Sequence, residues 1–363
     1  MDYYRGICYN FGVKILGIET SCDETAAAIV EDGAKILSNV VVSQIDIFKE
    51  YGGVIPEVAA RSHLEAMMPV VNKALSDAKC SWEEIDAIAV THAPGLLGSL
   101  LIGTLTARTL AILHNKPLYA VHHLKSHVYA NWLNATKENR LSPSDELKPI
   151  FPLIALVISG GHTQILYMPG HNQFEIIGTT HDDAIGECFD KVAKILGLPY
   201  PGGPSIAKAA LKGNETKYKF PHPKVGALDF SFSGLKTAVL RAVQKEVGVS
   251  ISYPSHQLKE LLNEQQVCDF AASFQKTAVE ILCEKLSLAL EMYPETQSVV
   301  IAGGVSANEE LRKALPEAYF PAPALSGDNG AMVAAAAYYE IQSGVEPTDP
   351  YSLNIYPRVS IEN

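Results

Sequence analysis

The 363-residue sequence lacks paired cysteines and any long uninterrupted hydrophobic run. Its six cysteines include no C-x-x-C pair, which argues against a disulfide framework and a structural zinc ribbon and is typical of a reducing compartment. No run of about 18 apolar residues predicts a membrane span. Residues 1–12 contain no apolar segment of a secretory signal. We therefore expect a cytoplasmic protein with no membrane association.

An excess of positive charge is also missing. The chain has 29 Lys and Arg against 40 Asp and Glu, a formal net charge of -11. Proteins that bind nucleic acid unaided normally cluster Lys and Arg against the phosphates. Any nucleic-acid role would therefore use a local basic patch or a partner protein.

Two histidines four residues apart, His123 and His127, are the most informative feature. On a helix they share one face and can bind the same metal ion. A metalloprotease helix would need a Glu directly after the first His, whereas Leu124 and Lys125 follow here. An isolated pair at this spacing also occurs by accident on a surface or in a core, so other residues must decide.

Two local patterns each occur twice. A strand, a polar turn and a second strand are predicted over 13–30 and again over 153–168. A strand, a Gly-rich turn and a helix are predicted over 87–115 and again from residue 298. Such turns let backbone amides approach an anion at a helix N-terminus. We therefore predict a duplicated two-lobe α/β fold that clamps a nucleotide between its lobes.

The length suits two lobes of about 150 residues each. A polar stretch poor in apolar residues, 134–148, marks the boundary between them. The expected order is an N-terminal extension (1–12), lobe I (13–133), a polar insert (134–150), lobe II (151–342) and a C-terminal tail (343–363).

Polar residues in the predicted turns are candidates for substrate chemistry. Asp23 and Glu24 are expected in the first loop, where carboxylates beside phosphates position a cation or water or act as acid and base. The alternative is a turn that caps its own backbone. Asp190, on a predicted helix facing the cleft, could accept ribose hydroxyls or simply pair with Lys191 on the surface.

A third metal ligand is expected at Asp328. It stands just before an apolar helix predicted over 331–339, where it could equally serve as a helix cap. Together with His123 and His127 it would complete a two-histidine, one-carboxylate site above the interlobe cleft.

Eight motifs follow one another along the chain: GIETSCDET from Gly17, the His123 and His127 pair, VISGGHT from Val157, FDK from Phe189, YPGGP from Tyr200, SFSGLK from Ser231, GGVSAN from Gly303 and DNGAM from Asp328. With them the chain resembles, over about residues 13–342, the TsaD/Gcp family of tRNA threonylcarbamoyladenosine transferases. The family commonly has Glu where this chain has Lys125, and often Asp where it has Ala207.

The resemblance implies an actin/Hsp70/sugar-kinase-like (ASKHA) fold. It implies transfer of a threonylcarbamoyl group from threonylcarbamoyl-AMP to N6 of adenosine 37 in tRNAs that read codons beginning with A, with AMP as the leaving group. The implied partners are tRNA, a TsaB-like paralogue and a TsaE-like ATPase. A small-molecule kinase of the same fold and a metalloprotease are the rival interpretations.

The resemblance also assigns roles to individual residues. One divalent metal, Fe2+ in the first place and Zn2+ as the alternative, would be bound by His123, His127 and Asp328. Asp23 would help to position the reacting groups, with Glu24 as the second catalytic candidate. The implied substrate-binding residues are Val157, Ile158, Ser159, Gly160, Gly161, Asp190, Gly203 and Asn308.

Overall fold

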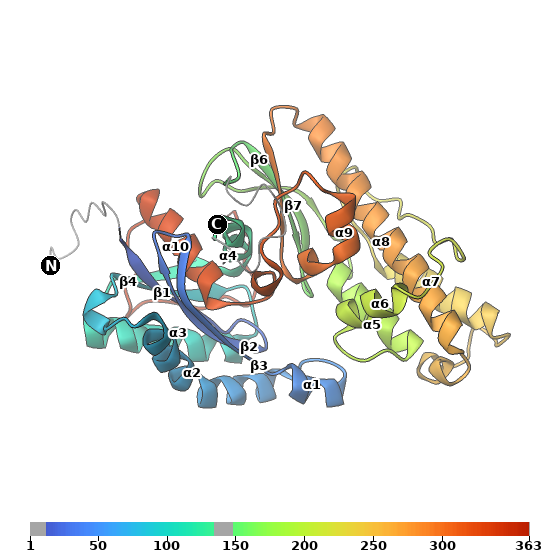
Figure 1. Ribbon diagram of the computed structural model, residues 1–363, viewed down its shortest axis with the longest axis horizontal. Helices are drawn as coiled ribbons and strands as arrows, with labels where there is room; N and C mark the ends of the chain where they lie inside the picture. The colour runs from blue at the N-terminus through green and yellow to red at the C-terminus, as the bar shows by residue number, and fades with distance from the viewer. Residues whose placement is uncertain (1–11, 134–147, 363) are drawn as a thin grey trace.

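The computed structural model describes residues 12–133 and 148–362. The expected N-terminal extension and polar insert therefore lie almost entirely outside the described residues. Two β-sheets, each with its own helices, stand next to one another in the described part of the chain (Figure 1).

The first sheet has five strands in the order β3-β2-β1-β4-β5. β1 pairs antiparallel with β2 and parallel with β4, β2 pairs antiparallel with β3, and β4 pairs parallel with β5. The strands are β1 (Lys14–Glu19), β2 (Glu24–Glu31), β3 (Lys35–Ser43), β4 (Ala87–Ala93) and β5 (Leu118–His122).

The second sheet repeats this pattern with four strands in the order β8-β7-β6-β9. β6 pairs antiparallel with β7 and parallel with β9, and β7 pairs antiparallel with β8. The strands are β6 (Leu153–Ile158), β7 (Thr163–Met168), β8 (Glu175–Thr179) and β9 (Ser298–Ala302). The duplicated two-lobe topology predicted from the recurring patterns is confirmed.

Helices cover both faces of both sheets, which is why β1 and β6 are continuous apolar runs rather than alternating ones. The helices are α1 (Ile45–Tyr51), α2 (Pro56–Ala78), α3 (Leu97–His114), α4 (His123–Tyr129), α5 (Ile185–Leu196), α6 (Gly202–Ala210), α7 (Ser233–Glu246), α8 (Glu264–Met292), α9 (Glu309–Ala314) and α10 (Gly330–Gln342). Short 3-10 helices occupy Trp82–Glu84, Ala130–Trp132, Ser255–Glu260, Gly304–Ala307 and Pro323–Leu325.

Three clusters of buried hydrophobic residues hold these elements together. α2 and α3 pack on one face of the first sheet, and α5 and α8 pack on one face of the second. α4 and α10 belong to a third core, which also contains inward residues of both sheets such as Ile15 of β1 and Val157 of β6. The helix that carries the histidine pair is thus buried where the two halves meet.

The predicted lobe II (151–342) includes α10, and in the structure this helix packs on the first sheet, against β1 and β2. A Cβ on Gly17 of β1 would lie 2.2 Å from the carbonyl oxygen of Gly330, so the missing side chain permits this close approach. The tail after α10 also returns to the first sheet, where the amide of Thr348 donates to Leu118 O. An alanine-rich helix is apolar on every side, so its sequence does not indicate which sheet it covers.

Within the described residues, α3 is long and apolar enough to cross a membrane by length and composition. It also packs against β4 and α2, and Gly103 and Ala107 are among its buried residues. A core helix of a globular protein satisfies the same criteria.

Candidate metal centre and substrate site

The histidine pair lies at the beginning of α4, immediately after β5. His122 is the N-cap, and its Nδ1 accepts a hydrogen bond of 3.2 Å from the amide of Leu124. His123 and His127 follow one turn apart and are both buried. Their rings meet edge to face with centroids 4.6 Å apart. The predicted shared face is present.

Asp328 reaches the same point from the loop before α10. The N-cap of α10 is Asn329, whose side chain accepts a 3.0 Å hydrogen bond from the amide of Met332, so the alternative in which Asp328 is the cap is wrong. The free carboxylate places Oδ1 3.1 Å from His127 Nε2 and 3.7 Å from His123 Nε2.

These three side chains fit a divalent ion. Their ligand atoms all lie within 4.8 Å of one another. Bonds of about 2.0–2.2 Å from nitrogen and oxygen to Zn2+ would separate neighbouring ligand atoms by about 3.5 Å. Both ring nitrogens of His127 are buried and have no hydrogen-bond partner in the described structure. An orphaned imidazole beside a carboxylate is what a metal ligand requires.

Sequence reasoning missed a second carboxylate, Glu19, at the end of β1. It is fully buried, and its Oε2 lies 3.3 Å from His123 Nδ1. The same carboxylate accepts hydrogen bonds of 2.5 Å from the amide of Ser21 and from the hydroxyl of Thr91. A carboxylate on Nδ1 leaves Nε2 of His123 as the metal-binding nitrogen. A charged residue ending a buried apolar strand was the available signal.

The charges of the site favour a cation. Burial opposes ionisation of Asp328, but His123 and His127 outweigh it and bring the pKa of its carboxyl to about 2. Burial likewise disfavours a charged His123, yet Asp328 and Glu19 raise the pKa of its imidazole to about 9. In the metal-free protein a proton on His123 therefore compensates one of the two negative charges of Asp328 and Glu19.

The turn between β1 and β2 faces this centre. Glu24 was predicted in the loop but is the first residue of β2, where Ser43 Oγ donates a 3.0 Å hydrogen bond to its Oε1. Burial, with the negative charges of Asp328 and Asp23, raises the pKa of Glu24 to about 9. Glu24 is therefore a neutral acid at neutral pH.

The turn between β6 and β7 offers exposed backbone. Gly160 and Gly161 are exposed, and a Cβ on either would meet no atom within 4 Å. The hydroxyl of Ser159 accepts a 3.2 Å hydrogen bond from the amide of His162 and so shapes the turn. Val157 and Ile158 are fully buried in β6, so the expectation that they contact substrate needs correction. They hold the turn in place.

Asp190 faces the N-terminus of α6. Its Oδ1 accepts a 2.6 Å hydrogen bond from the amide of Gly202, and burial raises the pKa of its carboxyl. The alternative of a surface pair with Lys191 is wrong, because Lys191 contacts Asp183 and Glu187 instead.

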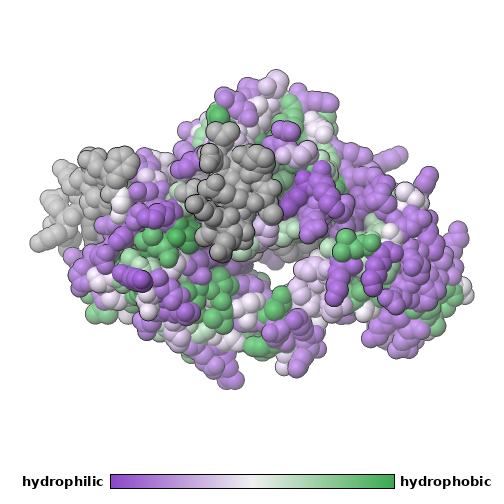
Figure 2. Space-filling model, viewed as in Figure 1, coloured by the Kyte–Doolittle hydropathy of each residue, from purple (hydrophilic) through white to green (hydrophobic). Residues whose placement is uncertain are grey.

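Asp190 also lies across from the first turn. The negative charges of Asp23 and Asp190 contribute, after burial, to the raised pKa of Tyr200. Gly203, next along α6, has open space at its Cβ position. Figure 2 shows a hollow between the two halves of the molecule, on the side where α1 faces α5 and α6 in Figure 1.

Asn308 is the N-cap of α9. Its Oδ1 accepts hydrogen bonds from the amides of Glu310 and Leu311, and its Nδ2 donates a 3.0 Å hydrogen bond to Gln275 Oε1. The structure thus shows a capping role for this side chain, and its contact with substrate stays a prediction.

Comparison with known proteins gives one family. The family model described as TsaD, tRNA N6-adenosine threonylcarbamoyltransferase, matches residues 35–335. The tRNA N6-adenosine threonylcarbamoyltransferase of Symbiobacterium thermophilum is 49% identical over 340 residues, covering 91% of this chain and 92% of that protein. The enzyme of the same name from Thermomicrobium roseum is 47% identical over 345 residues, with 91% and 93% covered.

Among solved structures, component A of (R)-2-hydroxyglutaryl-CoA dehydratase from Acidaminococcus fermentans aligns with 91% of this chain and 99% of its own, at 15% identity and a TM-score of 0.47. The sequence matches decide the classification. The chain belongs to the tRNA N6-adenosine threonylcarbamoyltransferase family and is a transferase that acts on N6 of adenosine in tRNA.

Proposed function

We propose that this transferase moves the threonylcarbamoyl group from threonylcarbamoyl-AMP to the adenosine beside the anticodon, and that it does so at the centre formed by His123, His127 and Asp328. The observation that carries the proposal is the meeting of these three side chains at the junction of the two halves. The ligand set is compatible with Fe2+, which we favour, and with Zn2+.

The reaction replaces one bond by another at the carbamoyl carbon. The N6 amine of adenosine attacks that carbon, the bond from it to the phosphate oxygen breaks, AMP leaves and N6 loses one proton. Because the donor is already activated, positioning and charge stabilisation contribute more than a strong base would. A bound divalent ion would supply Lewis-acid polarisation of the donor and a template for its oxygens.

The residues around the centre divide this work. Glu19 fixes the ring of His123 through Nδ1. The exposed amides of Gly160 and Gly161 would bind the phosphate of the donor, and Asp190 would accept its ribose hydroxyls. Glu24, neutral at physiological pH, would donate a hydrogen bond to the donor, and Asp23 would orient the reacting groups.

An apolar surface on α2 and α3 supports a protein partner. Large apolar side chains are exposed at positions four residues apart on each helix: Leu64 and Met68 on α2, and Leu97, Leu101 and Leu105 on α3. The helices α2 and α3 pack against each other. Adjacent exposed apolar residues of this kind mark interaction sites. We assign this surface to the TsaB-like paralogue.

The same surface explains the hydropathy of α3 without a membrane, and we therefore place the protein in the cytoplasm with its tRNA substrate. With a net charge of -11 the chain needs help to hold tRNA. The paralogue and a TsaE-like ATPase are the proposed sources of that help.

The test is product formation by the assembled components. The chain, its paralogue and its ATPase are incubated with threonylcarbamoyl-AMP and unmodified tRNA, and the digested RNA is analysed by mass spectrometry. We expect threonylcarbamoyladenosine in the wild-type reaction. Its absence would reject the proposal, and phosphorylation of a small metabolite by ATP would favour the kinase interpretation.

A further inference from the structure

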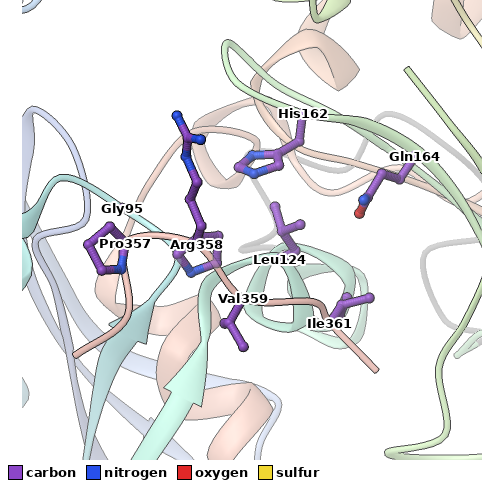
Figure 3. Close-up of a pocket in the computed structure, with 9 residues that line it drawn as sticks. Gly95, Leu124, His162, Gln164, Pro357, Arg358, Val359 and Ile361 are labelled. Atoms are coloured by element: carbon purple, nitrogen blue, oxygen red, sulfur yellow. The ribbon is translucent and has the colours of Figure 1, made fainter. Parts of the chain in front are cut away.

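A cavity of about 330 Å³ opens beside the metal centre, lined by residues from both halves and from the C-terminal segment. Pro94 and Gly95 follow β4, Leu124 lies on α4, His162 and Gln164 come from the β6–β7 hairpin, and Arg358 stands in the C-terminal segment (Figure 3). Its volume is at the small end for ligand pockets, which is enough for one flat ring system.

Three observations place this cavity next to the reaction centre. Leu124 directly follows the ligand His123. A Cβ on Gly95 would lie 2.6 Å from Ser21 O, and Ser21 Oγ is 3.2 Å from His123 Nδ1. Burial and the charges of His123 and His127 lower the pKa of His162 to about 4. The cavity therefore adjoins the metal centre and shares the β6–β7 turn with the donor site.

The C-terminal segment forms a fixed wall of the cavity. The amide of Tyr356 donates a 3.0 Å hydrogen bond to His92 O, and the amide of Gly95 donates a 3.3 Å hydrogen bond to Pro357 O. The carbonyl of Val359 lies 3.4 Å from His122 Nε2. Ile361, two residues further on, is buried in the core between the sheets. The backbone around Arg358 is thus tied to β4 and β5 on both sides.

Two polar side chains of the cavity lack partners. Arg358 is exposed and forms no hydrogen bond or ion pair with any residue that the structure describes, although the chain is strongly acidic. Gln164 Oε1 is buried and has no hydrogen-bond partner among the described residues. A free guanidinium suits a phosphate, and a free carboxamide can hydrogen-bond the edge of an adenine.

We infer that this cavity is the acceptor subsite, in which the target adenosine of the RNA is held unstacked while Arg358 binds a neighbouring phosphate. The inference rests on the proposed function, because it assigns the second substrate of the same centre. Extruded bases are commonly held in a pocket that reads their edge by hydrogen bonds and covers their faces with apolar side chains. Here Pro94, Pro357 and Leu124 supply the apolar contacts and Gln164 supplies the amide.

The experiment compares two anticodon stem-loop RNAs, one with the target adenosine and one abasic at that position, on the assembled complex. Fluorescence anisotropy gives the Kd of each RNA, and transfer kinetics give the KM of the donor. For wild type we expect the adenosine RNA to bind about fivefold or more tightly than the abasic RNA. The variant Gln164→Met, which keeps the length of the side chain, should remove this preference.

Arg358→Ala should raise the Kd of both RNAs about equally, by about tenfold. It should also reduce the slope of log affinity against log salt concentration by about the amount expected for one lost phosphate contact. Arg358→Lys should recover part of the loss. Lys245→Ala, which removes an exposed charge on α7, is the control and should leave both Kd values unchanged. Thermal unfolding and metal content of each variant exclude misfolding.

Equal binding of the two RNAs by wild type would overturn the inference, and so would a rise in the KM of the donor rather than in the Kd of RNA for Arg358→Ala. RNA binding needs no turnover, so it separates the two proposals. Missing product in wild type rejects the proposed function. Normal RNA discrimination by Gln164→Met, together with wild-type RNA affinity of Arg358→Ala, rejects the acceptor subsite alone.

Discussion

Replacing Glu19 by Gln should weaken metal binding while the fold stays intact. The carboxylate accepts from the amide of Ser21, the hydroxyl of Thr91 and, in the ligating tautomer, Nδ1–H of His123. A carboxamide has one acceptor oxygen, so it cannot serve all three donors. If its NH2 group faces Nδ1, it favours the His123 tautomer that carries the proton on Nε2, which cannot ligate.

The expected loss of metal affinity is about tenfold to a hundredfold, or about 1.4–2.7 kcal/mol. This agrees with the value of about 1.5–3 kcal/mol for a hydrogen bond to a charged group. The assay is titration of the apoprotein with Zn2+ against a chromophoric chelator, with the absorption spectrum of bound Co2+ as a second readout of ligand geometry.

Thr91→Val is the matched control, because it removes one hydrogen bond to Glu19 but keeps the charge beside His123. It should change the metal Kd by less than about threefold, since a neutral hydrogen bond contributes less than a charged one. Wild-type metal affinity in Glu19→Gln, or an equal loss in Thr91→Val, would refute the positioning role of Glu19.

Three further predictions concern protons and packing. First, His123 must lose a proton to bind metal, and its pKa is about 9 in the metal-free protein. Isothermal titration should therefore show that metal affinity rises about tenfold per pH unit below pH 9 and that metal binding releases a proton; an affinity independent of pH would contradict this. Second, burial, partly offset by Lys125, raises the pKa of Glu340 on α10 from 4.5 to about 7. The unfolded chain therefore ionises this group at a lower pH than the folded protein does, so the free energy of unfolding should fall by up to about 3 kcal/mol between about pH 4.5 and pH 7, and urea unfolding of Glu340→Gln should lack this slope. Third, Gly17→Ala would place a methyl group 2.2 Å from Gly330 O, so α10 must shift. We expect the free energy of unfolding to fall by about 1–3 kcal/mol, and metal binding to weaken because Asp328 stands just before α10. Unchanged metal affinity would show that the helix does not position Asp328.

The duplicated topology was predictable because each half repeats a strand–turn–strand and a strand–turn–helix. Those local patterns depend on periodicity and turn residues, which the sequence displays directly. The packing of α10 on the first sheet was not predictable. That placement depends on Gly17, whose missing side chain matters only once the helix is known to cross there.

The proposed metal ligands could be selected from the sequence because two of them are neighbours on one helix and the third stands in a recognisable motif. The sequence did not show that the carboxylate of Asp328 is left free to bind metal, since either Asp328 or Asn329 could have capped α10. Glu19 contacts His123, which stands 104 positions further along the chain, and Arg358 lines a cavity that only the folded chain forms. Local sequence patterns do not reveal such neighbours.

We expect transfer to take place at the centre formed by His123, His127 and Asp328. The most direct measurement is single-turnover product formation together with metal content, on the same preparations of wild type and of the His123→Ala, His127→Ala double variant, with paralogue, ATPase, threonylcarbamoyl-AMP and tRNA supplied. We predict bound metal and threonylcarbamoyladenosine for wild type, and loss of both for a double variant that is folded and still binds tRNA. Full product from the metal-free double variant would contradict the account.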